Sequence, residues 1–413
     1  NVIGRQVFDS RGNPTVEAEI FLDDGSSASA ISPSGASTGA FEAHELRDKE
    51  QNKFLGKSVY TAVQNINSKI SNKLKKLDFN QQEKIDKILI ELDGTENKTS
   101  LGANATLAIS LAYAKCTAIA NKQSLYKSLG KSYSLPIPLM NIINGGAHAD
   151  NDLNIQEFMI RPDSAKNFTD AIEKCFLVIN NLKKILQSKK MLTNVGDEGG
   201  FAPSINSNEE ALDLIVQSIE NSKLKPGNDI VICLDVAANE LMNEKGEYSV
   251  QSSNFLPVDD VVSYYKKLTS KYPIKSIEDP FAEEDWQSWK KITTAIGNNV
   301  QIVGDDLFVT NSKRLEKGIE EKSANSILVK PNQIGTLTET LNVISMAKKA
   351  NFNTIISHRS GDTEDTFIAD LAVATMSSQI KTGSLARSER VAKYNRLLRV
   401  EEELGNQSKM AKI

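Results

Sequence analysis

Cysteine, histidine and aromatic residues are all scarce in this chain of 413 residues. It contains three cysteines, three histidines and 6% aromatic residues. Cys116, Cys175 and Cys233 are widely spaced and form no CxxC pair, which argues against a disulfide framework and against a zinc site. A reducing, cytoplasmic environment is therefore the expected location of the protein.

Strong charge and long apolar runs are absent as well. The formal net charge is -4, which argues against nucleic acid or an anionic membrane as the primary partner. No apolar run approaches the roughly 20 residues that a membrane span needs, and we expect none. The first residues show no signal-peptide pattern, and Asn1 opens almost directly into a strand-like pattern, so we expect a few native residues ahead of it.

The first third of the chain predicts strands followed by helices, which is the pattern of an α+β domain. Apolar residues alternate over residues 16–22, and residues 23–25 (DDG) turn the chain into a second short strand, as in a β-hairpin. Helical periodicity then follows in three stretches, at residues 59–74, 85–92 and 103–120. The pattern changes after Gly130, and we expect an N-terminal domain of residues 1–130 and a second domain of residues 131–413.

Short apolar runs in the second part predict strands. The runs lie at residues 139–143, 155–160, 230–234, 274–277, 301–303, 327–329, 354–356 and 379–380. Helical patterns separate the later runs at intervals of roughly 25–30 residues, as in repeated βα units. No helix separates the first two runs, and two helical stretches follow the second. We therefore predict an α/β fold, an irregular (β/α)8 barrel of the TIM type that opens β-β-α-α.

Each of the last six runs ends at a polar residue that can take part in chemistry. These residues are Asp235, Glu278, Asp305, Lys330, His358 and Lys381. In a barrel they face the same C-terminal rim, where active sites are built. Three carboxylates brought together there would repel one another unless a cation lies between them, and hard oxygen ligands with room for water suit magnesium.

Each of these residues also has a simpler interpretation. Strand-end Asp and Glu often form turns or helix caps, and a lone lysine usually lies along the surface of the fold. For six consecutive strand ends we favour the functional interpretation, because turn chemistry does not call for Glu, Lys or His. A lysine near a second lysine and a bound metal is shifted towards its neutral form, as a general base requires.

Loop segments add further candidates. Residues 34–39 (SGASTG) offer backbone N–H groups and hydroxyls to a phosphate or a metal, although a linker explains them equally well. Residues 144–148 (NGGAH), together with Gln156 and Glu157, bring a histidine, an amide and a carboxylate near the barrel mouth. Residues 196–200 (GDEGG) place two acids in a glycine-flanked turn, which alone would be an ordinary turn.

With these segments identified, the chain resembles the enolase family from Gly4 to about Gly405. The matching strings, in chain order, are DSRGNPTVE, PSGASTG, INGGAHA with IQEFMI, GDEGGFAP, SIEDPFAEEDW, VGDDLFVTN, KPNQIGTLTET, SHRSGDTEDTFIADLAVA, and QIKTG with ARSER. Any one of them is only suggestive, but the ordered set spans almost the whole chain and leaves little room for coincidence. The fold implied is a small α+β domain ahead of an irregular barrel, in agreement with the pattern above.

The resemblance implies a reaction and a set of roles. Enolases interconvert 2-phosphoglycerate with phosphoenolpyruvate and water, and a base acting with magnesium is an established property of their superfamily. The first magnesium, which grips the substrate carboxylate, would be held by Asp235, Glu278 and Asp305. Lys330 would remove the C2 proton, while Lys381 and the metal stabilise the resulting dianion. Glu198, with Glu157 beside it, would assist departure of the C3 hydroxyl as general acid.

Further residues match by motif. Ser37 would reach a second magnesium as its loop closes, and Arg359 and Ser360 match the phosphate-binding pair, with Arg359 suited to a bidentate contact. Three residues would line the pocket, namely His148, Gln156 and His358. Enolases are usually homodimers, and some assemble into octamers. Arg11 and Glu402 match positions that pair across the dimer interface.

Two loops depart from the family pattern. Residues 236–242 read VAANELM, where most enolases have a serine before the glutamate and an aromatic residue soon after it. Residues 150–152 (DND) put two acids just past His148. Neither change falls on a candidate catalytic position, so we expect effects on loop closure and affinity rather than on the reaction.

Two other functions compete with this one. Another member of the same superfamily would act on a different carboxylate substrate, but Ser37 and residues 359–360 argue for a phosphorylated one. A displayed binding module that keeps only the fold would lack catalytic residues, and none is missing. A secondary role at the cell surface stays open, because Lys409 and Lys412 could attract a plasminogen-like, lysine-binding partner; a solvated tail is the simpler interpretation.

Overall fold

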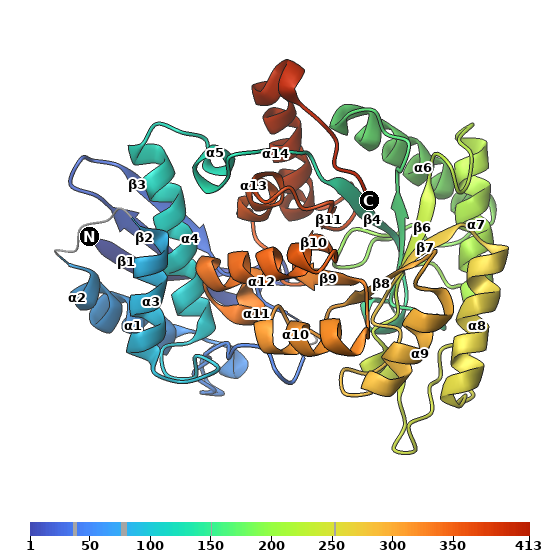
Figure 1. The fold of residues 1–413 in the computed structure, drawn as a ribbon, viewed down its shortest axis with the longest axis horizontal. Coiled ribbons are helices and arrows are strands. Elements are labelled where there is room, and N and C mark those ends of the chain that lie inside the picture. The colour runs from blue at the N-terminus through green and yellow to red at the C-terminus, as the bar shows by residue number, and fades with distance from the viewer. Residues whose placement is uncertain (36–38, 76–80, 150, 252) are drawn as a thin grey trace.

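The computed structural model describes the whole chain except residues 36–38, 76–80, 150 and 252. Two of the sequence predictions, on Ser37 and on Asp150, therefore lie outside the described residues. The strands form a three-stranded sheet and a closed eight-stranded barrel. The sheet and its helices occupy one end of the molecule, and the barrel with its surrounding helices occupies the other (Figure 1).

The N-terminal sheet is antiparallel and consists of β1 (Val2–Phe8), β2 (Pro14–Phe21) and β3 (Ser27–Ile31). Side chains alternate along β2, so that Val16, Ala18 and Ile20 are buried and the glutamates between them are not. This apolar face packs on α4 (Ala103–Ala120), a helix that is buried on nearly all sides. The predicted hairpin and the predicted buried helix are both present. The shorter helices here are α1 (Tyr60–Asn65), α2 (Ser71–Leu74), α3 (Gln82–Asp93) and α5 (Leu125–Leu129), with a π-helical segment (Ile66–Ile70) between α1 and α2.

The barrel closes in the order β10-β11-β4-β5-β6-β7-β8-β9. Its strands are β4 (Ile137–Asn144), β5 (Glu157–Arg161), β6 (Val231–Asp235), β7 (Ile274–Glu278), β8 (Gln301–Gly304), β9 (Ser326–Val329), β10 (Asn353–Ser357) and β11 (Gln379–Lys381). Strand β5 runs antiparallel to both β4 and β6, and the other neighbouring pairs are parallel. The predicted α/β barrel with its irregular β-β-α-α opening is confirmed.

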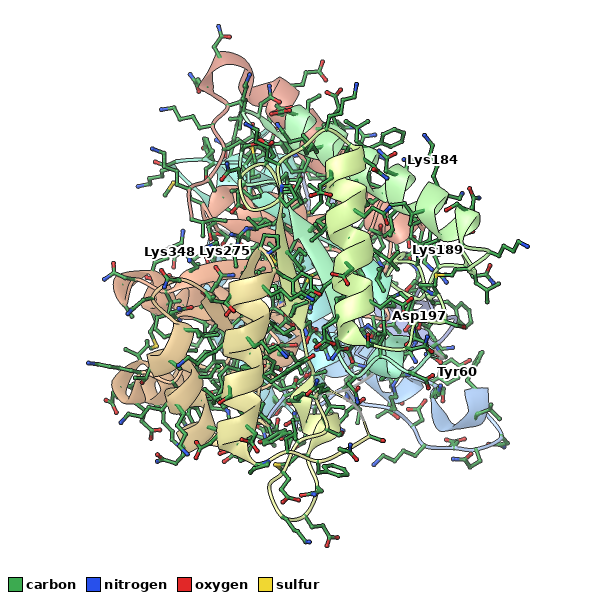
Figure 2. The ribbon with its side chains drawn as sticks, turned by 90° about the vertical axis from the view of Figure 1, so that its right-hand side faces the viewer. Tyr60, Lys184, Lys189, Asp197, Lys275 and Lys348 are labelled. Carbon is green, nitrogen blue, oxygen red and sulfur yellow. The ribbon has the colours of Figure 1, made fainter. Side chains whose placement is uncertain are left out.

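Helices surround the barrel and follow its strands. They are α6 (Phe168–Ser188), α7 (Asn208–Asn221), α8 (Val258–Lys271), α9 (Trp286–Ile296), α10 (Ser312–Glu321), α11 (Pro331–Ile334), α12 (Leu337–Lys349), α13 (Phe367–Ala374) and α14 (Ser388–Leu404). Helix α6 shows why they pack this way: Leu182 and Leu186 are buried, whereas Lys184 and Lys189 point into solvent (Figure 2). None of the helices in the described part of the chain combines the length and the apolar character that a bilayer span requires.

A layer of apolar side chains fills the middle of the barrel. A separate buried cluster within it consists of Leu139, Met159, Val231, Cys233, Val303, Leu328 and Ile355. Because these side chains occupy the middle of the barrel, polar groups that are to meet a substrate must project from the strand ends.

The N-terminal helices are anchored to the barrel by hydrogen bonds to α11 and α12. Thr106 donates to the carbonyl of Gly335 at 2.9 Å, and Asp86 accepts both the backbone N–H and the hydroxyl of Thr338. A β-bridge also joins Ser34 to Gly361. These contacts hold the segment after β3 beside the C-terminal ends of the barrel strands.

Candidate active site

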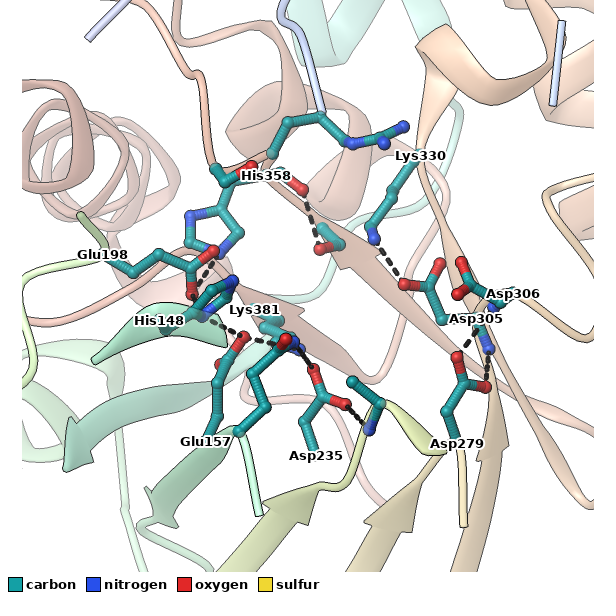
Figure 3. Close-up of a pocket in the computed structure, with 15 residues that line it drawn as sticks. His148, Glu157, Glu198, Asp235, Asp279, Asp305, Asp306, Lys330, His358 and Lys381 are labelled. Atoms are coloured by element: carbon teal, nitrogen blue, oxygen red, sulfur yellow. Dashed lines mark hydrogen bonds and ion pairs between the residues drawn. The ribbon is translucent and has the colours of Figure 1, made fainter. Parts of the chain in front are cut away.

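A polar pocket lies at the C-terminal ends of the barrel strands (Figure 3). Every site residue predicted from the sequence lines it except two. Glu278 lies directly below, hydrogen-bonded to the pocket residue Lys381, and Ser37 lies outside the described residues. The structure therefore brings together side chains from segments that are far apart in the sequence.

Lys381 lies among carboxylates at the end of β11. Its Nζ donates to Asp235 Oδ2 at 2.8 Å and to both carboxylate oxygens of Glu278 at 2.8 and 3.0 Å. Glu157 Oε1 lies 3.3 Å from the same nitrogen. Burial alone lowers the pKa of Lys381, but the surrounding carboxylates outweigh it and raise the pKa well above its ordinary value. Lys381 is therefore a permanent cation in this arrangement.

Lys330 faces the pocket from the start of α11. Its ammonium group donates to Asp305 Oδ2, while Gln333 donates to the other oxygen of that carboxylate at 3.0 Å. Burial lowers the pKa of Lys330, Asp305 raises it, and Arg359 and Lys381 lower it, with a net upward shift. Without a metal, the carboxylate partner dominates over the neighbouring cations, and the prediction that a bound metal shifts this lysine towards its neutral form stays a prediction.

The predicted metal ligands end three adjacent strands. Asp235 and Glu278 are the last residues of β6 and β7, and Asp305 directly follows β8. Burial, and after it the charge of Asp235, raises the pKa of Glu278 well above its usual value, which shows how strongly these carboxylates repel. Their oxygen donors and mutual repulsion fit a hard divalent cation such as magnesium.

Two further acids beside Asp305 were not singled out from the sequence. The carboxylate oxygens of Asp279 accept the backbone N–H groups of Asp305 and Asp306, each at 2.9 Å. The backbone of Asp279 itself has a positive φ of 42°. One ligand atom from each of the three carboxylates lies within 4.8 Å of the others. Burial and then Asp305 raise the pKa of Asp306 to about 7. The adjacent acids in SIEDP and VGDD were the available signal for this group.

Glu157 and Glu198 form a second acidic group on the other side of the pocket, beside His148 (Figure 3). Burial and the charge of Glu198 raise the pKa of Glu157 well above its usual value. Burial also acts to raise the pKa of Glu198, but His358 and His148 outweigh it, and the pKa of Glu198 lies well below its usual value. The two carboxyls are thus shifted in opposite directions, which favours a protonated Glu157 beside an ionised Glu198.

The Glu157 proton has a measurable consequence for stability. Because the folded-state pKa is above the unfolded one, the folded protein binds the extra proton, and stability decreases as pH rises above the unfolded value. Glu157→Gln mimics the protonated side chain. In chelator-treated protein, we expect wild type to lose stability relative to Glu157→Gln between pH 5 and 8, by at most about 1.4 kcal/mol per pH unit. Denaturant titrations at each pH measure this difference, and a constant or opposite difference would contradict the assignment.

Arg359 is oriented by a carboxylate from the N-terminal part of the chain. Its NH1 and NH2 groups donate to the two oxygens of Glu42 at 2.9 and 3.2 Å, and NH1 also donates to Asn332 at 3.2 Å. The bidentate partner of Arg359 in this arrangement is Glu42, and its expected contact with a phosphate stays a prediction. Glu42 follows the PSGASTG string closely, but nothing in its local sequence indicates a partner in the barrel.

Several buried polar atoms in the pocket have no hydrogen-bond partner among the described residues. They are His148 Nδ1, Gln156 Oε1, Glu157 Oε2, Glu198 Oε2 and His358 Nε2. Unpartnered buried polar atoms are costly in a folded protein. These atoms lie together on one wall of the pocket, so a polar ligand bound there could supply the hydrogen bonds that they lack.

One of the loops that depart from the family pattern is part of this site. The side-chain amide of Asn239 makes both contacts: Nδ2 donates to Asp306 at 2.9 Å, and Oδ1 accepts the backbone N–H of Glu283 at 2.8 Å. The segment at residues 236–242 therefore contacts the acids next to Asp305. A substitution in residues 236–242 can therefore affect Asp306 as well as the loop.

The fold and the site together define an α/β-barrel enzyme in which acidic and basic side chains meet at the C-terminal rim. The family models "Enolase, N-terminal domain" and "Enolase, C-terminal TIM barrel domain" match residues 1–129 and 132–413. The chain is also 62% identical over 411 residues to the enolase of Pelagibacter ubique (strain HTCC1062), a match that covers 99% of this chain and 98% of the relative. The chain belongs to the enolase family. Its class is that of the phosphopyruvate hydratases, metal-dependent lyases of glycolysis.

Proposed function

We propose that this protein interconverts 2-phosphoglycerate and phosphoenolpyruvate with Lys330 as the base at C2. The supporting observation is the arrangement of the pocket: Lys330 lies on one side and the Glu157–Glu198 pair on the other (Figure 3). Loss of a proton from C2 and of a hydroxyl from C3 needs a base and an acid at different places around the substrate. A single proton in the buried pair meets the second requirement.

The cofactor in this proposal is magnesium, two ions per site. The first would be held by Asp235, Glu278 and Asp305, and Ser37 is proposed to reach the second. When bound, the metal supplies positive charge that stabilises the carboxylate of the substrate as it becomes a dianion. Asp305 would then share its charge with that ion, and Arg359 and Lys381 would favour the neutral form of Lys330.

The remaining residues of the proposal bind and orient. Lys381 places its fixed positive charge beside the metal carboxylates, where it stabilises the dianion together with the metal. Arg359 and Ser360 are proposed to bind the phosphate group. The pocket is also lined by His148, Gln156 and His358, which would contact the substrate and help to exclude water.

The test is a direct assay of the purified protein. We expect 2-phosphoglycerate with magnesium to give phosphoenolpyruvate, followed by its ultraviolet absorbance. A strong chelator should abolish the signal and excess magnesium should restore it. Full turnover in strong chelator would contradict the metal assignment. Turnover of a non-phosphorylated 2-hydroxy acid in place of 2-phosphoglycerate would favour a different member of the superfamily.

We further propose a cytoplasmic homodimer, with an octamer as the alternative assembly. Arg11, which matches a family interface position, has a side chain that is 31% exposed and lies 3.4 Å from Asp197 of the same chain. Glu402 is exposed near the end of α14. Light scattering in magnesium buffer should give twice the mass of the chain, and a monomeric mass would count against the proposal.

A further inference from the structure

Arg390 on α14 is a buried guanidinium beside the pocket to which the reaction scheme assigns no role. Its side chain has no exposed surface. NH1 lies 2.7 Å from Nδ1 of His358 and donates to the carbonyl of Arg359 at 2.5 Å. NH2 donates to the carbonyls of Ser360 at 2.7 Å and Asp197 at 3.2 Å. One side chain thus connects the segment after β10 to the turn that contains Glu198.

We propose that Arg390 is a positioning residue that holds His358 in the tautomer protonated on Nε2, with that N–H directed at Glu198. The inference deepens the proposed function, since it takes the Glu157–Glu198 pair as the proton source of the reaction. The tautomer itself exists independently of any substrate.

The assignment follows from the hydrogen-bonding capacity of the two groups. A guanidinium has only donors, and it remains protonated in proteins. Nδ1 of His358, 2.7 Å away, must therefore be the acceptor, and the ring proton must be on Nε2. Nε2 lies 3.4 Å from Glu198 Oε2. The opposite tautomer would place two donors against each other at Nδ1 and a lone pair against a carboxylate at Nε2.

The charges around the ring favour its neutral form. Burial and, to a smaller extent, Arg390 lower the pKa of His358 to about 4, against the opposing effects of Glu198 and Asp362. Asp362 Oδ2 lies 3.6 Å from Arg390 NH1 and balances part of its charge. A neutral ring whose Nε2–H faces Glu198 favours the ionised form of this carboxylate.

Arg390 also fixes the distance between His358 and Glu198. It binds the carbonyls on either side of the pocket edge, at residues 359–360 and at Asp197. The segment before α14 strengthens the same link, because Ser384 donates its backbone N–H to the carbonyl of Glu198 at 2.8 Å. Loss of the guanidinium would free both the ring orientation and the position of the Glu198 turn.

The experiment uses the full-length, magnesium-loaded protein labelled with ¹⁵N-histidine. The chain has only three histidines, and the signals of His358 are identified by their loss in His358→Gln. Wild type should show His358 with an unprotonated Nδ1 and a protonated Nε2 at neutral pH. Arg390→Met should lose this pattern and lower kcat by about 10–100-fold, as is typical when the partner that orients a functional histidine is removed.

Matched variants separate positioning from general destabilisation. Arg390→Lys keeps one donor for Nδ1 and should retain the pattern with a smaller loss of kcat. Arg396→Met removes another guanidinium of α14, one that donates to Asp370, and should lower stability while leaving the His358 pattern and kcat unchanged.

Two results would overturn the proposal. One is a wild-type His358 protonated on Nδ1, which decides the matter even if Arg390→Met does not fold. The other is an Arg390→Met variant that keeps the wild-type pattern, whatever its kcat. If the wild-type pattern is as expected but 2-phosphoglycerate is not turned over, the proposed function fails and the tautomer assignment stands.

Discussion

Lys330→Ala is expected to lower kcat with 2-phosphoglycerate by about 10²–10⁴-fold, the usual contribution of a positioned general base. It should also stop the exchange of the C2 proton with solvent. A cation bound to Asp305 would weaken the contact between Asp305 and Lys330. Lys381, in contrast, is held by several carboxylates at once. Of the two, we therefore propose Lys330 as the base.

The measurement is mass-spectrometric detection of deuterium at C2 of recovered 2-phosphoglycerate, in D₂O and saturating magnesium. Saturating metal is needed because the variant leaves Asp305 without its cationic partner. Lys349→Ala, at an exposed lysine that ends α12, is the matched control and should exchange at the wild-type rate. Exchange at the wild-type rate in Lys330→Ala would require a different base.

Lys381→Met should lower kcat by about 10²–10³-fold, the typical loss when a preorganised electrostatic group is removed. Its effect on the fold should be larger than that of Lys330→Ala. The variant leaves Asp235, Glu278 and Glu157 around an apolar side chain, and breaking a buried ion pair in this way costs about 3–5 kcal/mol. We expect that destabilisation in chelator, and a smaller one in saturating magnesium.

Denaturant titrations with and without magnesium measure the second effect. The pKa of Lys381 is raised above its unfolded value of about 10.4, so its own charge is fully present between pH 6 and 8. Lys381 also lowers the pKa values of Glu157 and Glu278, so these carboxyls bind protons more strongly in the variant, and the stability difference in chelator should grow as pH rises through this range. Lys98→Met removes a buried lysine that pairs with Glu339 away from the pocket, and it should cost stability in both conditions without loss of kcat. Equal stability of wild type and Lys381→Met in chelator would refute the structural part of the prediction.

The strands and the identity of the residues at their ends could be predicted because both depend on local pattern. Short apolar runs separated by helical periods specify βα units, and closure of the barrel then brings the strand ends to one rim. Asp235, Glu278 and Lys381 were found in this way. The family resemblance added the roles, since spacing alone does not separate Lys330 from Lys381.

The sequence by itself thus determined the barrel, the rim and the residue types that meet there. Only the tertiary structure decided how they pair: Glu42 contacts Arg359 across 317 positions of the chain, and Arg390 on α14 contacts the Asp197–Glu198 turn. It also placed Glu157 and Glu198 in surroundings that raise the pKa of the first and lower that of the second. The physical reason is that hydrogen-bond partners and pKa values depend on distance, burial and neighbouring charge in three dimensions, and none of these is a property of a local sequence pattern.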